Sequence, residues 1–198
     1  MPPRRALRGP PPTSLLPKSE PLDPVGFLTE QCRNALSSVP EECGRSLIES
    51  IVSAERIFIF GVGRSGLVAQ TFAIRLVQMG LRVYFVGDMT TPIIGKDDLL
   101  ILVSNTGNTM SVVKTAQIAQ GIGTRRISIT ANGKSSLAKT SDEVIVISAS
   151  NPEAKDLAPL GTLFEDATFL FFDSLVPPLM KRLGVTEEDM RNNHAIWV

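Results

Sequence analysis

Histidine, cysteine and the larger aromatic residues are scarce in this 198-residue sequence. It contains one histidine, two cysteines, one tryptophan and one tyrosine. The cysteines lie far from the histidine along the chain, so no spacing would assemble a zinc or other transition-metal site. Two thiols are also too few for a disulfide scaffold, which favours a reduced, cytoplasmic protein without a metal.

The chain also has no excess of charge and no long apolar run. Twenty lysines and arginines balance twenty acidic residues, so no positive field is available to hold nucleic acid or an anionic membrane. No apolar run reaches the roughly 18 to 20 residues that span a bilayer, and the chain begins without an apolar signal-peptide core. We therefore expect no nucleic-acid partner and no membrane association, and any anionic ligand must be bound locally.

Proline is concentrated at the start of the chain, where eight of the fourteen prolines fall within the first 24 residues. Because proline fixes φ and lacks an N–H group, residues 1–24 are predicted to form a disordered tail. Residues 25–198 are long enough to bury one substantial core, which predicts a single domain.

Beyond residue 55, short apolar runs alternate with segments of helical periodicity. Runs that are apolar throughout are typical of parallel strands buried on both faces. This predicts an α/β fold, a doubly wound five-stranded parallel sheet with helices on both faces. The predicted strands are residues 57–60, 82–86, 99–103, 126–130 and 144–147. Helices are predicted twice between 25 and 53 and at 65–79, 109–121, 135–139, 162–176 and 186–192, with Pro177 and Pro178 ending or kinking the long one.

The first predicted strand is followed by a glycine-rich turn. Ligands of such sheets bind beyond the carboxyl ends of the strands, where turns expose amides at helix starts. Residues 61–66 read GVGRSG, in which the glycines let the backbone approach a ligand, Arg64 offers a planar cation and Ser65 a hydroxyl. This GxGxxG pattern, with Asp88 further on, also fits a dinucleotide site. An ordinary tight turn capped by Ser65 is the structural alternative.

The third predicted strand is followed by a hydroxyl-rich turn, SNTGNT at residues 104–109. The hydroxyls of Ser104, Thr106 and Thr109 surround a glycine and lead into a helix. Three hydroxyl donors, free amides and a helix dipole form a neutral cradle for a phosphate monoester. A helix cap needs only one such side chain, and a dinucleotide fold does not require this cluster, so a phosphate ester is favoured.

These two turns together resemble the SIS (sugar isomerase) family, whose members bind phosphosugars. Further segments resemble its 6-phospho-3-hexuloisomerases in particular: TTP at 90–92, LAPLGTLFE at 157–165, GVTEEDM at 184–190 and His194-Ala195. The resemblance runs from about Phe27 to the C-terminus. The chain closes with NHAIWV at 193–198, where those proteins tend to have Arg-His-Ala-Asn-Leu-Glu.

The resemblance implies a flavodoxin-like three-layer sandwich and a cofactor-independent isomerase. It would interconvert D-arabino-hex-3-ulose 6-phosphate and D-fructose 6-phosphate through an enediol, as in formaldehyde assimilation by the ribulose monophosphate pathway. Glu165 would be the base and His194 the assisting acid or base, reaching a neighbouring subunit's site in a homo-oligomer, expected to be a tetramer. The implied substrate-binding residues are Gly63, Arg64, Ser65, Thr90, Ser104, Asn105, Thr106 and Thr109.

Several alternatives stay open at this point. An aldose-ketose isomerase acting on another phosphosugar, such as arabinose 5-phosphate, would use the same base and cradle. A non-catalytic protein that binds a sugar phosphate and regulates a partner would keep the cradle alone. Residues 162–165 also fit a capping box, in which Glu165 would merely bond back to the helix start. A lone histidine near a chain end, like His194, is commonly a solvated surface residue.

Overall fold

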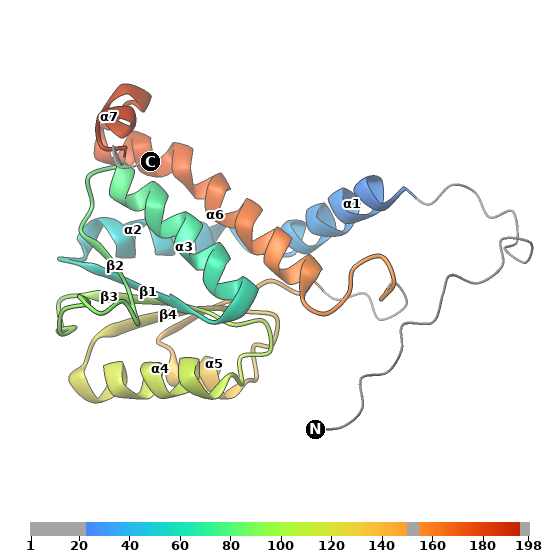
Figure 1. The fold of residues 1–198 in the computed structure, drawn as a ribbon, viewed down its shortest axis with the longest axis horizontal. Coiled ribbons are helices and arrows are strands. Elements are labelled where there is room, and N and C mark those ends of the chain that lie inside the picture. The colour runs from blue at the N-terminus through green and yellow to red at the C-terminus, as the bar shows by residue number, and fades with distance from the viewer. Residues whose placement is uncertain (1–22, 150–154, 195–198) are drawn as a thin grey trace, which may run out of the picture.

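The computed structural model describes residues 23–149 and 155–194 and contains a five-stranded parallel sheet between two layers of helices (Figure 1). The strand order is β2-β1-β3-β4-β5, and every neighbouring pair is parallel. The predicted doubly wound fold is confirmed. The predicted tail, residues 1–24, falls outside the described residues except for its last two. The strands are β1 Ile57–Gly61, β2 Val83–Phe85, β3 Leu99–Val103, β4 Arg125–Thr130 and β5 Glu143–Val146.

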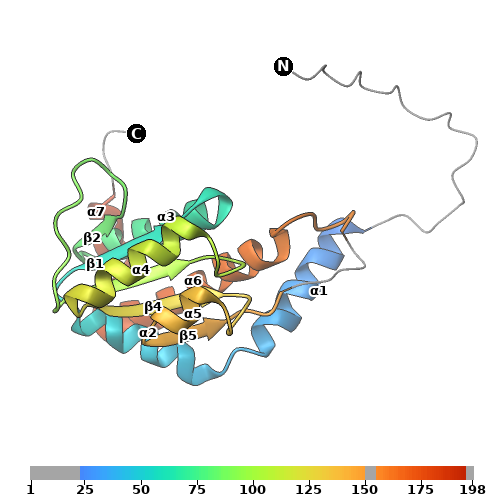
Figure 2. The ribbon, with the colours of Figure 1, turned by 90° about the horizontal axis from the view of Figure 1, so that it is seen from below.

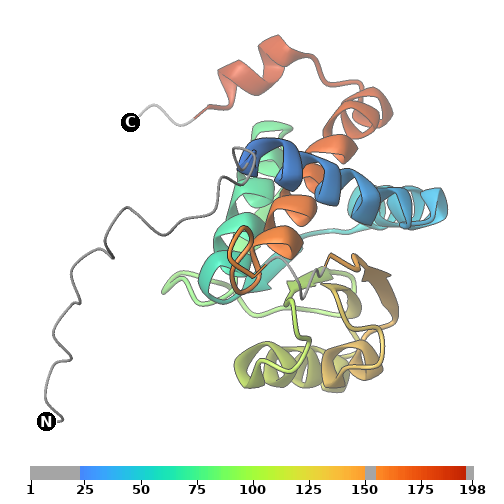
Figure 3. The same cartoon turned by 90° about the vertical axis from the view of Figure 1, so that its right-hand side faces the viewer.

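The helices divide between the two faces of the sheet. One face is covered by α2 (Glu41–Ser53), α3 (Gly63–Gln78) and α6 (Thr162–Leu183), and α1 (Pro24–Ser37) packs along α6 (Figures 1 and 3). The other face carries α4 (Met110–Ile122) and α5 (Ser136–Thr140), which Figure 2 shows from below. The short α7 (Glu187–Asn192) lies at the C-terminal end of α3. None of the helices in the described ranges is long and apolar enough to cross a membrane.

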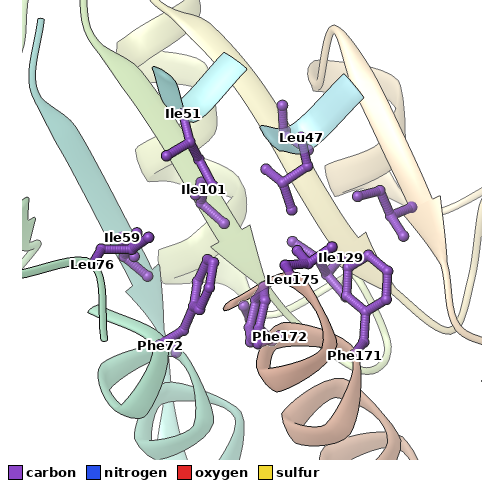
Figure 4. Close-up of a cluster of buried hydrophobic side chains, with 14 of the residues drawn as sticks. Leu47, Ile51, Ile59, Phe72, Leu76, Ile101, Ile129, Phe171, Phe172 and Leu175 are labelled. Carbon is purple, nitrogen blue, oxygen red and sulfur yellow. The ribbon is translucent and has the colours of Figure 1, made fainter. Parts of the chain in front are cut away.

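The side chains of the strands contribute alternately to two apolar clusters, because successive side chains point to opposite faces of the sheet. Ile57 and Ile59 of β1 belong to the larger cluster, beneath α2, α3 and α6, whereas Phe58 belongs to the smaller one beneath α4 and α5. In the larger cluster the rings of Phe72 and Phe172 stack with centroids 4.2 Å apart (Figure 4). Such a pair adds about 1 kcal/mol beyond the area it buries, and here it joins α3 to α6.

The long helix differs from the prediction at its prolines. The helix does not end at Pro177 and Pro178, and α6 continues through Leu183. The two prolines remove hydrogen bonds to the carbonyls four residues earlier, those of Asp173 and Ser174. All four residues are exposed, so these carbonyls face solvent. The buried residues on the opposite side, among them Phe172, Leu175 and Leu179, hold the helix to the sheet.

Candidate active site

The two turns singled out in the sequence meet at the centre of the sheet. Gly61 ends β1 directly beside Val103, which ends β3. The following helices, α3 and α4, pack on opposite faces of the sheet (Figures 1 and 2). In open α/β sheets such a reversal defines a crevice, here the one between the two turns. Neither helix start is capped by a described side chain, which leaves first-turn amides open toward the crevice. Such a switch point is where open α/β sheets bind ligands.

The glycine-rich turn, residues 61–66, brings the start of α3 very close to the end of β1. A Cβ atom built at Gly66 would lie 2.6 Å from the carbonyl oxygen of Gly61, so only glycine fits there. Gly63 has φ +62°, which also favours glycine. The first turn of α3 therefore presents Arg64 and Ser65 directly at the crevice, Arg64 exposed and Ser65 buried.

The hydroxyl-rich turn, residues 104–109, is ordered by its own side chains. The hydroxyls of Ser104 and Thr109 lie 3.2 Å apart, and the amide of Gly107 donates to Ser104 Oγ at 3.2 Å. Thr106 Oγ1 accepts from the amide of Asn108 at 3.2 Å. All three predicted hydroxyls thus belong to one compact turn. Thr106 and one member of the Ser104–Thr109 pair can donate to an anion while these bonds stay in place.

This turn rests against the start of α5. The amide of Leu137 donates to the carbonyl of Gly107 at 2.9 Å, and that of Ser136 donates to Asn108 Oδ1 at 3.1 Å. A Cβ at Gly107, whose φ is +63°, would lie 2.1 Å from Ser135 Oγ. The close packing against Ser135 fixes the turn at the mouth of the crevice.

Glu165, in the first turn of α6, points toward the glycine-rich turn. Arg64 Nε donates to Glu165 Oε2 at 2.5 Å, and Ser65 Oγ donates to Oε1 at 3.3 Å. The Glu165 side chain is only 10% exposed, whereas that of Arg64 is 63% exposed. The capping-box alternative is wrong, because α6 has no side-chain cap and Thr162 Oγ1 donates to the carbonyl of Pro159 instead. The carboxylate is thus held inside the crevice.

The turn before α6 also reaches the hydroxyl-rich turn. A Cβ built at Gly161 would lie 2.8 Å from Asn105 Nδ2 and 3.3 Å from Glu165 Oε1. The absence of a side chain at Gly161 therefore leaves room for the Asn105 amide and the Glu165 carboxylate on either side of one small space. Asn105 links the predicted phosphate cradle to the predicted base.

A second carboxylate follows directly in α6. Asp166 Oδ1 lies 3.6 Å from Arg64 Nη2. Burial raises the pKa of Asp166, the nearby Glu165 charge adds to this rise, and the Arg64 charge opposes it. Burial also raises the pKa of the Cys32 thiol in α1, to which the Asp166 charge contributes. Among the described residues no three His, Cys, Asp or Glu side chains are grouped as a metal ion would require.

Comparison with known proteins identifies the family. The model of the SIS domain matches residues 50–170, more than half of the chain, and this stretch contains both turns and Glu165. The chain belongs to the SIS domain family. The 3-hexulose-6-phosphate isomerase of Methanocaldococcus jannaschii is 40% identical over 76% of this chain and 81% of that protein. The protein of the same name from Bacillus subtilis is 34% identical over 86% of this chain and 95% of its own length.

A solved structure agrees with this assignment over most of the chain. It is a Methanococcus jannaschii protein whose structure led to the inference of a 3-hexulose-6-phosphate isomerase function. It superposes with a TM-score of 0.81 at 34% identity and covers 89% of this chain and all of the other. The likeness therefore extends beyond residues 50–170.

The remaining predicted site residues are Thr90 and His194. Thr90 sits in the exposed turn after β2, next to β1 in the sheet, and in this turn Thr91 Oγ1 donates to the carbonyls of Phe85 and Asp88. His194 follows Asn193, whose Nδ2 donates to the carbonyl of Gln78 at the far end of α3. Since α3 has 16 residues, His194 lies about 24 Å along that helix from the glycine-rich turn of its own chain.

Sequence reasoning missed Asp166, Ser135 and Gly161. Ser135 and Gly161 matter because their small size lets residues distant in the sequence pack closely, and a local sequence pattern does not reveal such contacts. Asp166 follows directly on Glu165, and this pair of consecutive carboxylates is a signal that the sequence did contain. The remaining residues of the chain's divergent end, 195–198, lie outside the described part.

Proposed function

We propose that this SIS domain is a sugar-phosphate isomerase that interconverts D-arabino-hex-3-ulose 6-phosphate and D-fructose 6-phosphate, with no cofactor or metal. The observation that supports this most directly is the buried Glu165 carboxylate, held by Arg64 and Ser65 beside the hydroxyl-rich turn. The 3-hexulose-6-phosphate isomerases among its relatives, similar over most of their length, support the choice of substrate.

In this proposal the phosphate is bound by the hydroxyl-rich turn. The hydroxyls of Ser104, Thr106 and Thr109 and the open amides at the start of α4 hold the dianion, and the Asn105 amide adds a donor. The sugar then extends toward the glycine-rich turn, where Gly63, Arg64 and Ser65 line it, with Thr90 closing the side toward β2. This orientation places the carbon chain along Glu165.

The reaction moves a ketone from carbon 3 to carbon 2. Glu165 takes the proton from carbon 2, the electron pair of that C–H bond forms the C2–C3 double bond, and oxygen 3 gains a proton. The resulting enediol loses the proton of oxygen 2, and Glu165 returns a proton to carbon 3. One carboxylate can make both transfers, because carbons 2 and 3 are adjacent and both protons move on one face of the enediol. Arg64 stabilises the negative charge that develops on the enediol oxygens.

A second acid or base has to move protons between oxygens 2 and 3, and we assign it to His194. An imidazole exchanges protons near neutral pH. Since His194 lies at the far end of α3 from its own Glu165, it would serve the site of a neighbouring subunit. The protein is accordingly proposed to be a homo-oligomer, with a tetramer as the expected form.

Turnover by the purified protein tests the proposal. 3-Hexulose 6-phosphate is generated in place from ribulose 5-phosphate and formaldehyde by a synthase, and fructose 6-phosphate is read by a coupled dehydrogenase. We expect Glu165→Gln to lower kcat at least about 1000-fold, because the amide cannot accept the proton. Glu49→Gln is the matched control, since Glu49 is exposed on α2 and pairs with Arg182 away from the crevice.

The alternatives give different results in the same assay. Turnover of arabinose 5-phosphate in place of the hexulose phosphate would show an aldose-ketose isomerase. Tight binding of fructose 6-phosphate with no turnover would contradict catalysis and indicate a regulatory protein. Unchanged kcat in Glu165→Gln would remove Glu165 as the base.

A further inference from the structure

Arg64 contacts two consecutive carboxylates at the start of α6 through two different nitrogens. Its Nε donates to Glu165 Oε2 at 2.5 Å, and its Nη2 lies 3.6 Å from Asp166 Oδ1. The Glu165 side chain is 10% exposed and that of Asp166 is 40% exposed. The guanidinium therefore lies between a buried acceptor inside the crevice and a half-buried acceptor at its rim.

In this arrangement two donors compete with a substrate for the Glu165 carboxylate. Oε2 accepts the short contact from Arg64, and Oε1 accepts from the hydroxyl of Ser65. A carboxylate that takes a proton from carbon must turn an oxygen lone pair to that C–H bond. Each oxygen keeps a second lone pair, but the strong charge-assisted bond from Arg64 holds the carboxylate most firmly, and its release leaves Glu165 freer to turn.

Asp166 is placed to take over that bond. A guanidinium carries five N–H donors in a rigid fork, so a rotation within the Arg64 side chain exchanges one carboxylate for the other without moving the backbone. Arg64 is mostly exposed and has room for this rotation. Partial burial beside Cys32 makes the ionised Asp166 depend on a nearby cation, which favours the closer pairing.

We propose that Asp166 is a positioning residue, which receives the Arg64 guanidinium when a sugar phosphate binds and so frees Glu165 to act as the base. The inference rests on the proposed isomerase function. Asp166 touches no reacting atom; it acts through Arg64, which it keeps at the rim of the crevice alongside the sugar. Without the Asp166 charge, Arg64 should stay bonded to Glu165. A sugar phosphate would then have to break that ion pair in order to bind.

The test compares Asp166→Asn with Asp173→Asn, which makes the same chemical change two turns further along α6. For each variant we would measure kcat and KM with 3-hexulose 6-phosphate and the affinity for fructose 6-phosphate by calorimetry. We expect Asp166→Asn to lower kcat about fivefold and to weaken binding by a smaller factor, as for a partly exposed ion pair. Asp166→Glu, which keeps the charge, should recover most of the loss, and Asp173→Asn should match the unmodified protein.

An Arg64→Gln background separates positioning from a general structural effect. If Asp166 acts through Arg64, adding Asp166→Asn to Arg64→Gln causes no further loss. Equal losses with and without Arg64, or an Asp166→Asn variant that behaves like Asp173→Asn, would overturn the inference. If the parent protein binds fructose 6-phosphate without turnover, the isomerase proposal is wrong. The role of Asp166 is then judged from affinity alone, by whether Asp166→Asn weakens binding only when Arg64 is present. A parent protein that does neither overturns both proposals.

Discussion

At the scale of single residues, glycines decide how closely the pieces of the crevice approach one another. Gly66 brings α3 against the end of β1, and Gly161 leaves space between Asn105 and Glu165. Gly107 is constrained in two ways. Its φ is +63°, and a Cβ atom at this position would overlap Ser135. A side chain at Gly107 would have to displace the turn that carries the three hydroxyls.

Replacing Gly107 should therefore damage stability and ligand binding together. We expect Gly107→Ala to lower the free energy of unfolding by about 2 kcal/mol or more, through left-handed strain and overlap with Ser135, and to abolish calorimetric binding of fructose 6-phosphate. Gly121→Ala in α4 is the control, because nothing lies within 4 Å of its Cβ position and its φ is ordinary. It should raise the free energy of unfolding by about 0.5 kcal/mol in a urea titration. Normal binding by Gly107→Ala would show that the turn tolerates displacement.

At the scale of elements, α6 combines packing and chemistry in one helix. Its first turn supplies Glu165 and Asp166, and its middle supplies Phe172 to the stack with Phe72 (Figure 4). It continues through Pro177 and Pro178 because its buried side is apolar. The packing of this side outweighs the lost hydrogen bonds of the two prolines.

Removing one proline should therefore stabilise the protein. We expect Pro177→Ala to raise the free energy of unfolding by about 1 kcal/mol or more, because an N–H group returns to the helix and the ring no longer crowds the preceding turn. Pro40→Ala is the opposite control. Pro40 precedes α2 with φ −60° and breaks no helical hydrogen bond, so its loss should cost about 0.5 kcal/mol through the unfolded chain. A destabilised Pro177→Ala protein would contradict a continuous α6.

The elements that sequence predicts best are those whose signal is local. The central strand β3 was predicted at its observed bounds, because all five of its residues are buried and apolar. The edge strand β2, predicted at residues 82–86, has Cα partners only over Val83–Phe85. The flanking residues still bond to β1, since Arg82 accepts from the amide of Ile57 and the amide of Val86 donates to Ile59, so the difference lies only in where the strand ends are drawn. The helix end predicted at the α6 prolines was wrong, because helix propensity depends on the local sequence, whereas the packing that overrides it involves residues far apart in the chain.

The candidate site divides in the same way. Turns after strands and their hydroxyls are visible in sequence, so residues 61–66 and 104–109 can be identified from it as candidates. The roles assigned to them stay predictions. The partner of Glu165 was not predicted, because Arg64 lies 101 residues away along the chain. The capping-box pattern offered a local partner instead, and the tertiary contact replaced it.

At the scale of the whole molecule, the predicted base and the predicted assisting histidine lie at opposite ends of α3. Asn193, where related proteins tend to have arginine, fastens this end of the chain to the carbonyl of Gln78. If both residues act in the proposed isomerase, two chains would have to contribute to each site.

Mixing two inactive variants tests this arrangement. If His194 serves a neighbouring subunit, Glu165→Gln and His194→Ala chains should each be inactive, and unfolding and refolding them together should restore about a quarter of the parent activity, the share of intact sites in randomly paired dimers. The single variants refolded alone are the controls. A mixture as inactive as its components would place both residues in one chain's site, and a monomer in light scattering would exclude sharing altogether.

The position of Glu165 at the start of α6 also bears on how the protein is made. The chain leaves the ribosome from its amino terminus, so the sheet and both turns are synthesised before α6 appears. Until then the larger apolar cluster lacks Phe164 and Phe172, and the crevice lacks its carboxylate. One late segment thus completes the core and carries the carboxylate proposed as the base. Defects that loosen α6 should accordingly remove both together.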